Sequence, residues 1–193
     1  MSGPATHGTT GPAAAPPVRR DVALELVGGR ERIGCKGPGA EAWLRDAGFD
    51  LPAGANRFVA DASLLIARLG YSEFFLEAAA GSPPLAALAA GLERAPAGVY
   101  PVLREDWRLT LCGADVHQVL AQVCNVDFAA LDARSNPVVM TMMIGVAVLV
   151  VPLAAAGAPA YAIWCDPSYG PYLSGTLGSV VVESGGIFKG GAA

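Results

Sequence analysis

Cysteine and histidine are the side chains with the clearest catalytic potential here, and Cys112 and His117 lie only five positions apart. A thiol and an imidazole can act as a nucleophile and its base. A helical turn takes 3.6 residues, so a five-residue step does not align the two side chains. Cys112 also falls in the strand expected before the helix. We therefore interpret Cys112 as structural and His117 as a surface residue, and keep a thiol enzyme that uses Cys112 as an alternative hypothesis.

The other sulfur and imidazole groups do not form a metal-binding or disulfide pattern. His117 and Cys124 are seven positions apart but lack further ligands, and His7 stands alone near the N-terminus. The cysteines form no C-x-x-C pair and are widely separated: Cys35, Cys112, Cys124 and Cys165. We expect four reduced, mostly buried thiols in a reducing compartment, and no metal site.

The stretch Lys36-Gly37-Pro38-Gly39 has the composition of a phosphate-binding loop but not its spacing. A Walker A loop requires G-x-x-x-x-G-K-[ST], and a dinucleotide fingerprint requires G-x-G-x-x-G after a strand. Neither pattern is present. The sequence therefore predicts no catalytic and no cofactor-binding residue in this chain.

Charged residues are scarce in the composition. They make up 16% of the 193 residues, and 53% are hydrophobic, whereas about 25% of residues are charged in a typical globular protein. This balance excludes a disordered chain. With 13 Lys and Arg against 17 Asp and Glu, the formal charge is -4, so we expect no nucleic-acid partner. Because so little charge is available to cover the surface, we infer that part of it is buried against partner proteins.

The segment between Arg134 and Asp166 carries no charge and approaches the length of a membrane-spanning helix. It is rich in β-branched residues, which favour strands, and Gly145 and Pro152 interrupt it. We interpret it as two buried strands, Val138–Val151 and Tyr161–Cys165, joined by a loop, and expect no membrane association. The N-terminal residues lack the charge pattern of a signal peptide, so we expect a cytoplasmic protein.

Two stretches share a layout at an offset of 76 residues. Arg32 to Gly37 and Arg108 to Gly113 each read as a strand that ends in a glycine turn, and an amphipathic helix follows each of them. Two β-type runs and a further helix come next in both halves; the last helices are Pro83–Leu92 and one that opens at Asp166-Pro167. The predicted fold is α+β, with duplicated β-α-β-β-α units and antiparallel sheets covered by helices.

The expected organisation is a flexible arm at 1–20, a domain at 21–184 and a glycine-rich tail at 185–193. The domain divides into halves at about 21–97 and 98–184. An aromatic cluster opens the last helix and is typical of an interface, because Trp and Tyr supply large contact areas. The candidate residues for a subunit interface are Trp164, Tyr169 and Tyr172.

Four segments resemble the gamma subunit of heterotetrameric sarcosine oxidase: Arg32–Ala40, Ala67–Leu76, Asp106–Gly113 and Trp164–Leu173. The resemblance covers about Asp21 to Ser184. It implies a fold related to the folate-binding aminomethyltransferase of glycine cleavage. It also implies alpha, beta and delta subunits as partners, in a complex that oxidatively demethylates sarcosine to glycine and passes the one-carbon unit to tetrahydrofolate.

The resemblance places the cofactors of such a complex, FAD, FMN, NAD, tetrahydrofolate and zinc, outside this chain, which would be a non-catalytic subunit. Two alternatives stay open besides the thiol enzyme. One is a subunit of an N-methylglutamate dehydrogenase-like complex. The other is a stand-alone folate-binding, aminomethyltransferase-like protein, for which the chain has about half the usual length.

Overall fold

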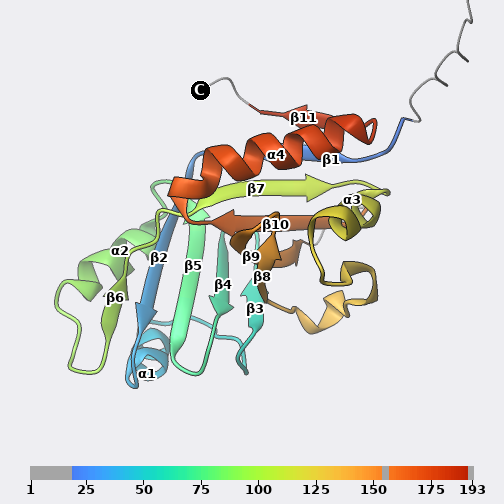
Figure 1. Cartoon of the computed structure of the whole chain (residues 1–193). Helices are drawn as coiled ribbons and strands as arrows, with labels where there is room; N and C mark the ends of the chain where they lie inside the picture. The colour runs from blue at the N-terminus through green and yellow to red at the C-terminus, as the bar shows by residue number, and fades with distance from the viewer. Residues whose placement is uncertain (1–18, 154–156, 191–193) are drawn as a thin grey trace, which may run out of the picture.

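Two β-sheets pack face to face in the computed structural model, which describes residues 19–153 and 157–190 (Figure 1). The six-stranded sheet has the order β11-β1-β7-β10-β9-β8: Ile187–Lys189, Ala23–Leu26, Trp107–Cys112, Ala160–Cys165, Val146–Leu153 and Val139–Met143. The five-stranded sheet has the order β3-β4-β5-β2-β6: Arg57–Ala60, Leu64–Arg68, Glu73–Ala79, Arg30–Lys36 and Tyr100–Val102. Neighbouring strands are antiparallel except β1 and β11, which are parallel. The predicted α+β class with antiparallel sheets is confirmed.

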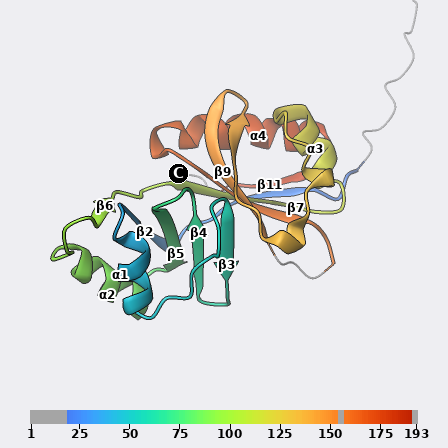
Figure 2. The same ribbon diagram turned by 90° about the horizontal axis from the view of Figure 1, so that it is seen from below.

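Helices cover the outer face of each sheet, so that the fold has four layers (Figures 1 and 2). The four α-helices are α1 (Ala40–Asp46), α2 (Pro83–Leu92), α3 (Val116–Val123) and α4 (Gly170–Glu183). Helices α3 and α4 share a core with the six-stranded sheet, and α1 and α2 share one with the five-stranded sheet. A third core joins the inner faces of the two sheets.

The alternation of side chains along each strand produces these layers. In β10, Tyr161 and Ile163 face the helices, and Trp164 faces the other sheet. In β5, Phe74 packs toward α1 and α2, and Phe75 packs against the ring of Trp164, with ring centroids 5.3 Å apart. Both faces of the central strands are therefore buried. Such strands read as continuous apolar runs.

This double burial explains the uncharged segment of the sequence. Strands β8, β9 and β10 occupy it, and no helix among the described residues is long and apolar enough to cross a membrane. The predicted single strand Val138–Val151 is wrong, because it forms a hairpin that turns at Ile144 and Gly145. The loop predicted from Pro152 starts later as well. Strand β8 begins at Val139, opposite Val150, and does not reach the level of Pro152. Strand β9 can therefore contain Pro152 without losing a hydrogen bond to β8.

Both predicted strand–turn–helix segments are present. Gly37 and Gly113 have φ angles of 121° and 128°, and helices α1 and α3 begin three residues after them. A Cβ atom at Gly113 would lie 2.1 Å from the carbonyl oxygen of Asp21, and one at Gly37 would lie 2.3 Å from that of Gly98. Both turns therefore require glycine.

The expected boundary near residue 97 does not separate the two sheets. Strand β1, from the first half, pairs with β7 in the six-stranded sheet, and β6, from the second half, pairs with β2 in the five-stranded sheet. Each half thus contributes its first strand to the sheet of the other half. This exchange interlocks the two halves into one unit.

The C-terminal residues extend the fold past the predicted end of the domain at residue 184. The side chain of Asp166 caps the short 3-10 helix Pro167–Tyr169, which leads into α4 as predicted. Strand β11 then pairs with β1, within the segment predicted to be a glycine-rich tail. Phe188 packs against α4 at Gly178, and this contact explains why the tail joins the sheet.

Of the predicted N-terminal arm, all but Arg19 and Arg20 lies outside the described residues.

Two glycines of α4 give a direct test of the packing of β11. A Cβ atom at Gly175 would have no neighbour within 4 Å, whereas one at Gly178 would lie 2.6 Å from the ring of Phe188. We expect Gly175→Ala to raise the free energy of unfolding by about 0.5–1 kcal/mol, because alanine favours the helix. We expect Gly178→Ala to lower it by about 1–3 kcal/mol, because the ring must move. Urea denaturation measures both; equal stability of the two variants would contradict the packing of β11 on α4.

Candidate functional site

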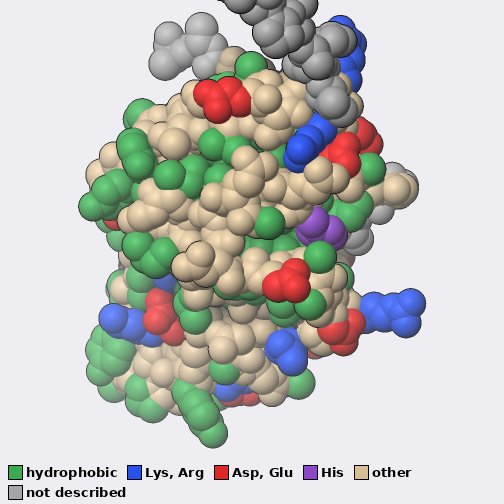
Figure 3. All heavy atoms as spheres, turned by 45° about the vertical axis from the view of Figure 1, so that its right-hand side comes forward, with side chains coloured by type: hydrophobic (Ala, Val, Ile, Leu, Met, Phe, Trp, Pro, Cys, Tyr) green, Lys and Arg blue, Asp and Glu red, His purple; other side chains and the backbone are tan. Residues whose placement is uncertain are grey.

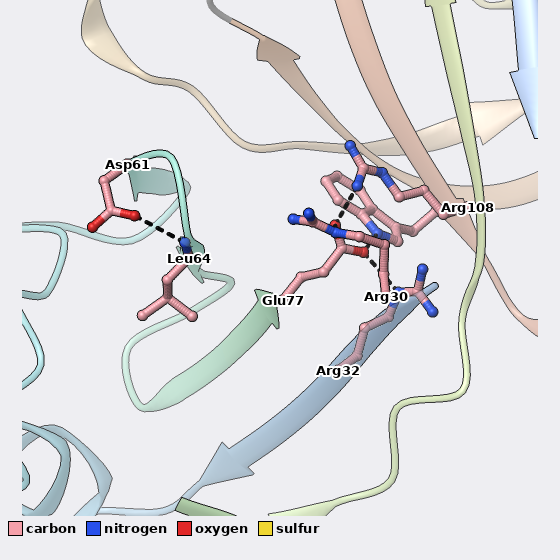
Figure 4. Close-up of polar contacts among 7 residues, drawn as sticks. Arg30, Arg32, Asp61, Leu64, Glu77 and Arg108 are labelled. Carbon is pink, nitrogen blue, oxygen red and sulfur yellow. Dashed lines mark hydrogen bonds and ion pairs between the residues drawn. The ribbon is translucent and has the colours of Figure 1, made fainter. Parts of the chain in front are cut away.

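A fully buried carboxylate, Glu77, lies where the two sheets cross (Figure 4). Its Oε1 accepts hydrogen bonds from Arg30 Nε (3.2 Å) and Arg108 Nη1 (2.6 Å). Its Oε2 accepts from Arg32 Nε (2.8 Å) and Trp164 Nε1 (2.6 Å). The guanidinium of Arg108 also lies 5.3 Å from the centre of the Trp164 ring. We call these five residues the Glu77 cluster.

The Glu77 cluster is structural rather than a ligand site. Its residues come from β2, β5, β7 and β10, so it ties the central strands of both sheets together. A buried carboxylate is stable only when donors satisfy its oxygens. Both oxygens of Glu77 already accept two hydrogen bonds, which leaves this carboxylate unavailable to a cofactor.

The cluster corrects one of the predicted interface residues. Trp164 is fully buried inside this chain, where its indole nitrogen donates to Glu77 and its ring packs on Phe75. Trp164 is therefore a core residue of this chain and not the exposed aromatic residue that the prediction of an interface requires. The local sequence around an aromatic residue near the start of a helix does not tell whether the residue lies in a core or at an interface. Here the five-stranded sheet, which packs over Trp164, makes it a core residue.

The predicted thiols are all free, and three of them are buried: Cys35, Cys124 and Cys165. Burial raises the pKa of both Cys35 and Cys165 to about 11, which disfavours the reactive thiolate. His117 does not pair with Cys112; its Nε2 lies 2.7 Å from Tyr161 Oη. Among the residues described, there is no cluster of three or more His, Cys, Asp or Glu side chains that could hold a metal ion.

Two large clefts open on the described surface. One, of about 860 Å³, lies between α1, α2 and the strands β3 and β4. Three aspartates line it, Asp46, Asp50 and Asp61. Asp61 accepts hydrogen bonds from Ser63 and, as Figure 4 shows, from Leu64 N in the β3–β4 turn. These bonds lower the pKa of Asp61. Asp61 Oδ1 therefore stabilises the turn.

The second cleft, of about 820 Å³, is lined on one side by residues of the β8–β9 hairpin. We call it the inter-sheet cleft. Its lining comes from the β4–β5 turn, the segment that joins β6 to β7, the β8–β9 hairpin and the end of β10: Leu69, Glu73, Leu103, Arg104, Glu105, Asp106, Met140, Thr141, Met142, Ala147, Val148, Leu149, Trp164, Cys165, Asp166 and Pro167.

Large apolar side chains are exposed along the inter-sheet cleft. Leu103 is 81% exposed, and Met140 and Met142 are 53% and 55% exposed. On the face drawn in Figure 3, hydrophobic and uncharged atoms cover most of the surface and charged groups are scattered. The sequence interpretation did not single out these residues. The alternation in Met140-Thr141-Met142 was the available signal, since methionine is common on adaptable binding surfaces.

The hairpin that carries the methionines has an unusual turn. Ile144 and Gly145 both have positive φ angles, 51° and 78°, as a two-residue primed turn requires. A β-branched residue rarely adopts this conformation. Two contacts hold it here: Ile144 N donates to Val123 O, and Ile144 O accepts from Tyr172 Oη at 3.4 Å.

Polar groups in the inter-sheet cleft lack partners. Asp106 Oδ2 and Arg104 Nε are buried and make no hydrogen bond within the described chain. Arg104 instead uses Nη2 to bind Glu73 at 2.7 Å, and its Nη1 lies 3.8 Å from Asp106. Burial is the main cause that raises the pKa of Asp106; the charge of Arg104 opposes this rise, and the nearby Asp166 adds slightly to it. An unsatisfied buried carboxylate is costly in the isolated chain.

The other two predicted interface residues, Tyr169 and Tyr172, are not among the residues that line this cleft. Tyr169 and Tyr172 are half-exposed and follow Asp166 and Pro167, which line it. Their contact with a partner stays a prediction. The site that combines exposed apolar side chains with unsatisfied polar atoms is thus the inter-sheet cleft.

Comparison with known proteins identifies the fold. No protein-family model matches the sequence, and no curated protein matches it significantly. Among solved structures, the chain is similar to heterotetrameric sarcosine oxidase from Corynebacterium sp. U-96, with a TM-score of 0.70 and 24% identity. The match covers 91% of this chain and 90% of that chain.

A second similar structure is the glycine cleavage system aminomethyltransferase T from Bartonella henselae, with a TM-score of 0.61 and 19% identity. The match covers 89% of this chain but 48% of the aminomethyltransferase, so the chain spans about half of that protein. The predicted resemblance to a sarcosine oxidase chain with an aminomethyltransferase-like fold is confirmed at the level of the fold.

Replacing Glu77 tests whether the buried cluster holds the sheets together. We expect Glu77→Gln to lower the free energy of unfolding by about 3–5 kcal/mol, because it leaves buried guanidinium groups without a counter-charge. Glu41→Gln is the matched control, since Glu41 also pairs with two arginines but is partly exposed. Its buried partner Arg68 also donates to the carbonyl oxygens of Gly70 and Tyr71, so we expect a smaller loss. Guanidinium chloride denaturation monitored by tryptophan fluorescence measures both. Similar losses in the two variants would show that the cluster is not needed.

Asp106 gives a pH-dependent test of the inter-sheet cleft. Its pKa in the folded chain lies above the ordinary 3.8, so ionisation disfavours the folded state. The protonated Asp106 carboxyl contributes to the stability of the folded state. This contribution is complete below pH 3.8 and is lost as the pH rises through the raised pKa of Asp106. We expect Asp106→Asn to be more stable than the wild type at pH 7, with a smaller difference at pH 3. Urea midpoints at both pH values measure this; a less stable variant at pH 7 would contradict it.

Proposed function

We propose that this chain is a non-catalytic, gamma-type subunit of a sarcosine oxidase-like oxidoreductase complex. The observation that carries the proposal is the match to a chain of a heterotetrameric sarcosine oxidase over nine-tenths of both chains. The exposed apolar side chains of the inter-sheet cleft support it, because such a surface is typical of a protein–protein contact. Alpha, beta and delta-type chains are the proposed partners.

The chemistry in this proposal belongs to the partner chains. The complex oxidatively demethylates sarcosine to glycine and transfers the one-carbon unit to tetrahydrofolate, and FAD, FMN, NAD and zinc are bound by the other subunits. The residues described here do not fit a zinc ion, since they form no cluster of three or more ligands. Both oxygens of the buried carboxylate Glu77 are occupied, and the thiols Cys35 and Cys165 are held protonated.

The proposal also includes a duplicated origin for the two halves. Arg32 pairs with Glu77 across β2 and β5, and Arg108 pairs with Trp164 across β7 and β10. Arg32 and Arg108 are related by the 76-residue offset, and both bind Glu77 at the centre of the molecule. A cytoplasmic location follows from the proposed partners. A complex that oxidises N-methylglutamate instead of sarcosine is distinguished by the assay below.

Co-expression tests the proposed function. We expect the chain to co-purify at fixed stoichiometry with alpha, beta and delta-type chains encoded beside it, and the assembled complex to oxidise sarcosine. Steady-state oxygen consumption with sarcosine and with N-methylglutamate identifies the amine. The control is the isolated chain, which we expect to turn over neither amine and to show no heat of tetrahydrofolate binding. Failure to associate, or turnover by the chain alone, would overturn the proposal.

A further inference from the structure

We propose that the inter-sheet cleft is the docking site for an apolar segment of a partner subunit, and that this segment places one lysine or arginine side chain beside Asp106 and Asp166. The inference rests on the proposed function, which supplies the partner, and it adds the surface and the chemistry of the contact. Apolar area, charge and unsatisfied polar atoms in the cleft each support it.

The apolar part of the cleft is a continuation of the core between the sheets. Along β8 and β9, Leu149 packs in that core. Met140 lies opposite Leu149, and Met142 lies opposite Ala147 one step nearer the turn. These positions share the inner face of the six-stranded sheet, but the five-stranded sheet does not cover the two methionines. The inner face of the β8–β9 hairpin is therefore buried core at Leu149 and exposed to solvent at the two methionines.

The charge of the cleft is strongly unbalanced. Among the described residues that line it, the acids are Glu73, Glu105, Asp106 and Asp166, and the one base is Arg104. Arg104 is already bound to Glu73 at 2.7 Å. Asp166 adds slightly to the raised pKa of Asp106, and the charges of both carboxylates raise the pKa of the Cys165 thiol. A cationic side chain between these two carboxylates would complement them.

The unsatisfied atoms favour a polypeptide as the occupant. Asp106 Oδ2 needs a donor, and Arg104 Nε needs an acceptor. A peptide segment with a basic residue supplies both, through the side-chain ammonium or guanidinium group and a backbone carbonyl. Leu103 and the two methionines are exposed to about half or more, so the site is an open trough, which suits a chain segment.

A second copy of this chain is a poor occupant of the same surface. A twofold contact through the cleft would place this acidic surface patch against the same patch of the other copy. With the chain as a whole carrying a formal charge of -4, such a contact would be repulsive. A basic, apolar segment of a different chain avoids this repulsion.

The test compares two cleft variants with one control in the co-expressed complex. Met142→Glu places a charge on the apolar part of the cleft, and Asp106→Asn removes the buried carboxylate. Val182→Glu is the matched control, because Val182 is 57% exposed, close to the 55% of Met142, but lies on α4, which covers the opposite face of the six-stranded sheet. Binding of each purified variant to an immobilised complex of the alpha, beta and delta-type chains gives the dissociation constant.

We expect Met142→Glu and Asp106→Asn to weaken binding at least about tenfold, and Val182→Glu to bind like the wild type. The Asp106→Asn chain alone should be at least as stable as the wild type, so its weaker binding cannot come from unfolding. A photo-crosslinker in place of Met142 should capture a partner peptide that is apolar and contains a lysine or arginine.

Two outcomes overturn the inference separately from the proposed function. If the wild type binds the immobilised complex and both cleft variants bind equally well, the partner docks elsewhere and the proposed function stands. If light scattering shows a wild-type dimer that Met142→Glu dissociates, the cleft binds a second copy. If the wild type does not bind the complex, the proposed function and the inference fall together.

Discussion

A carboxylate at full burial, such as that of Glu77, requires donors for both oxygens, and here the donors come from both sheets. Glu77 and two of its arginines belong to the five-stranded sheet, whereas Arg108 and Trp164 belong to the six-stranded sheet. Sliding one sheet over the other would remove Arg108 or Trp164 from the carboxylate. Apolar packing alone tolerates small shifts, but this hydrogen-bonded group does not. The relative position of the two sheets is therefore fixed by one buried charge.

The inter-sheet cleft is a consequence of that arrangement. Because the strands of the two sheets cross and their overlap is fixed at Glu77, the five-stranded sheet cannot extend along the whole inner face of the β8–β9 hairpin (Figure 2). The exposed end of the hairpin keeps the apolar residues of an inner face. The segment that joins the sheets brings Arg104 and Asp106 to the same place. A surface with core-like composition thus forms at a position set by the ion cluster.

The similarity to sarcosine oxidase and to the aminomethyltransferase concerns the fold, and a fold alone does not define an activity. In this chain the carboxylate at the centre, Glu77, is fully hydrogen-bonded. Two of the unsatisfied buried side-chain atoms of the described residues, Asp106 Oδ2 and Arg104 Nε, belong to residues that line the inter-sheet cleft, and the others are Trp107 Nε1 and Arg108 Nε. A partner that covered the inter-sheet cleft would bury its apolar side chains and supply hydrogen-bonding groups to Asp106 and Arg104. This is the physical argument for the proposal that the chain is a subunit.

Much of the local structure could be predicted from the sequence. Helix α2 has the predicted bounds, Pro83 to Leu92, because proline at its start and the following alanine and leucine residues favour a helix locally. The two glycine turns and the cap at Asp166 were also predictable, since they depend on neighbours a few residues away. The β-branched composition of the uncharged segment indicated strands. What the sequence alone determined was the type and order of most elements.

The tertiary structure decided which side chains are core and which are surface. Trp164 and Glu77 are 87 positions apart, and only their contact makes the tryptophan a core residue. The pairing of β1 with β11 and the exposure of Met140 and Met142 likewise depend on segments distant in the sequence. Local propensity acts over a few residues, whereas burial depends on what packs above each face. For that reason the elements could be predicted from the chain, and the position of the cleft could not.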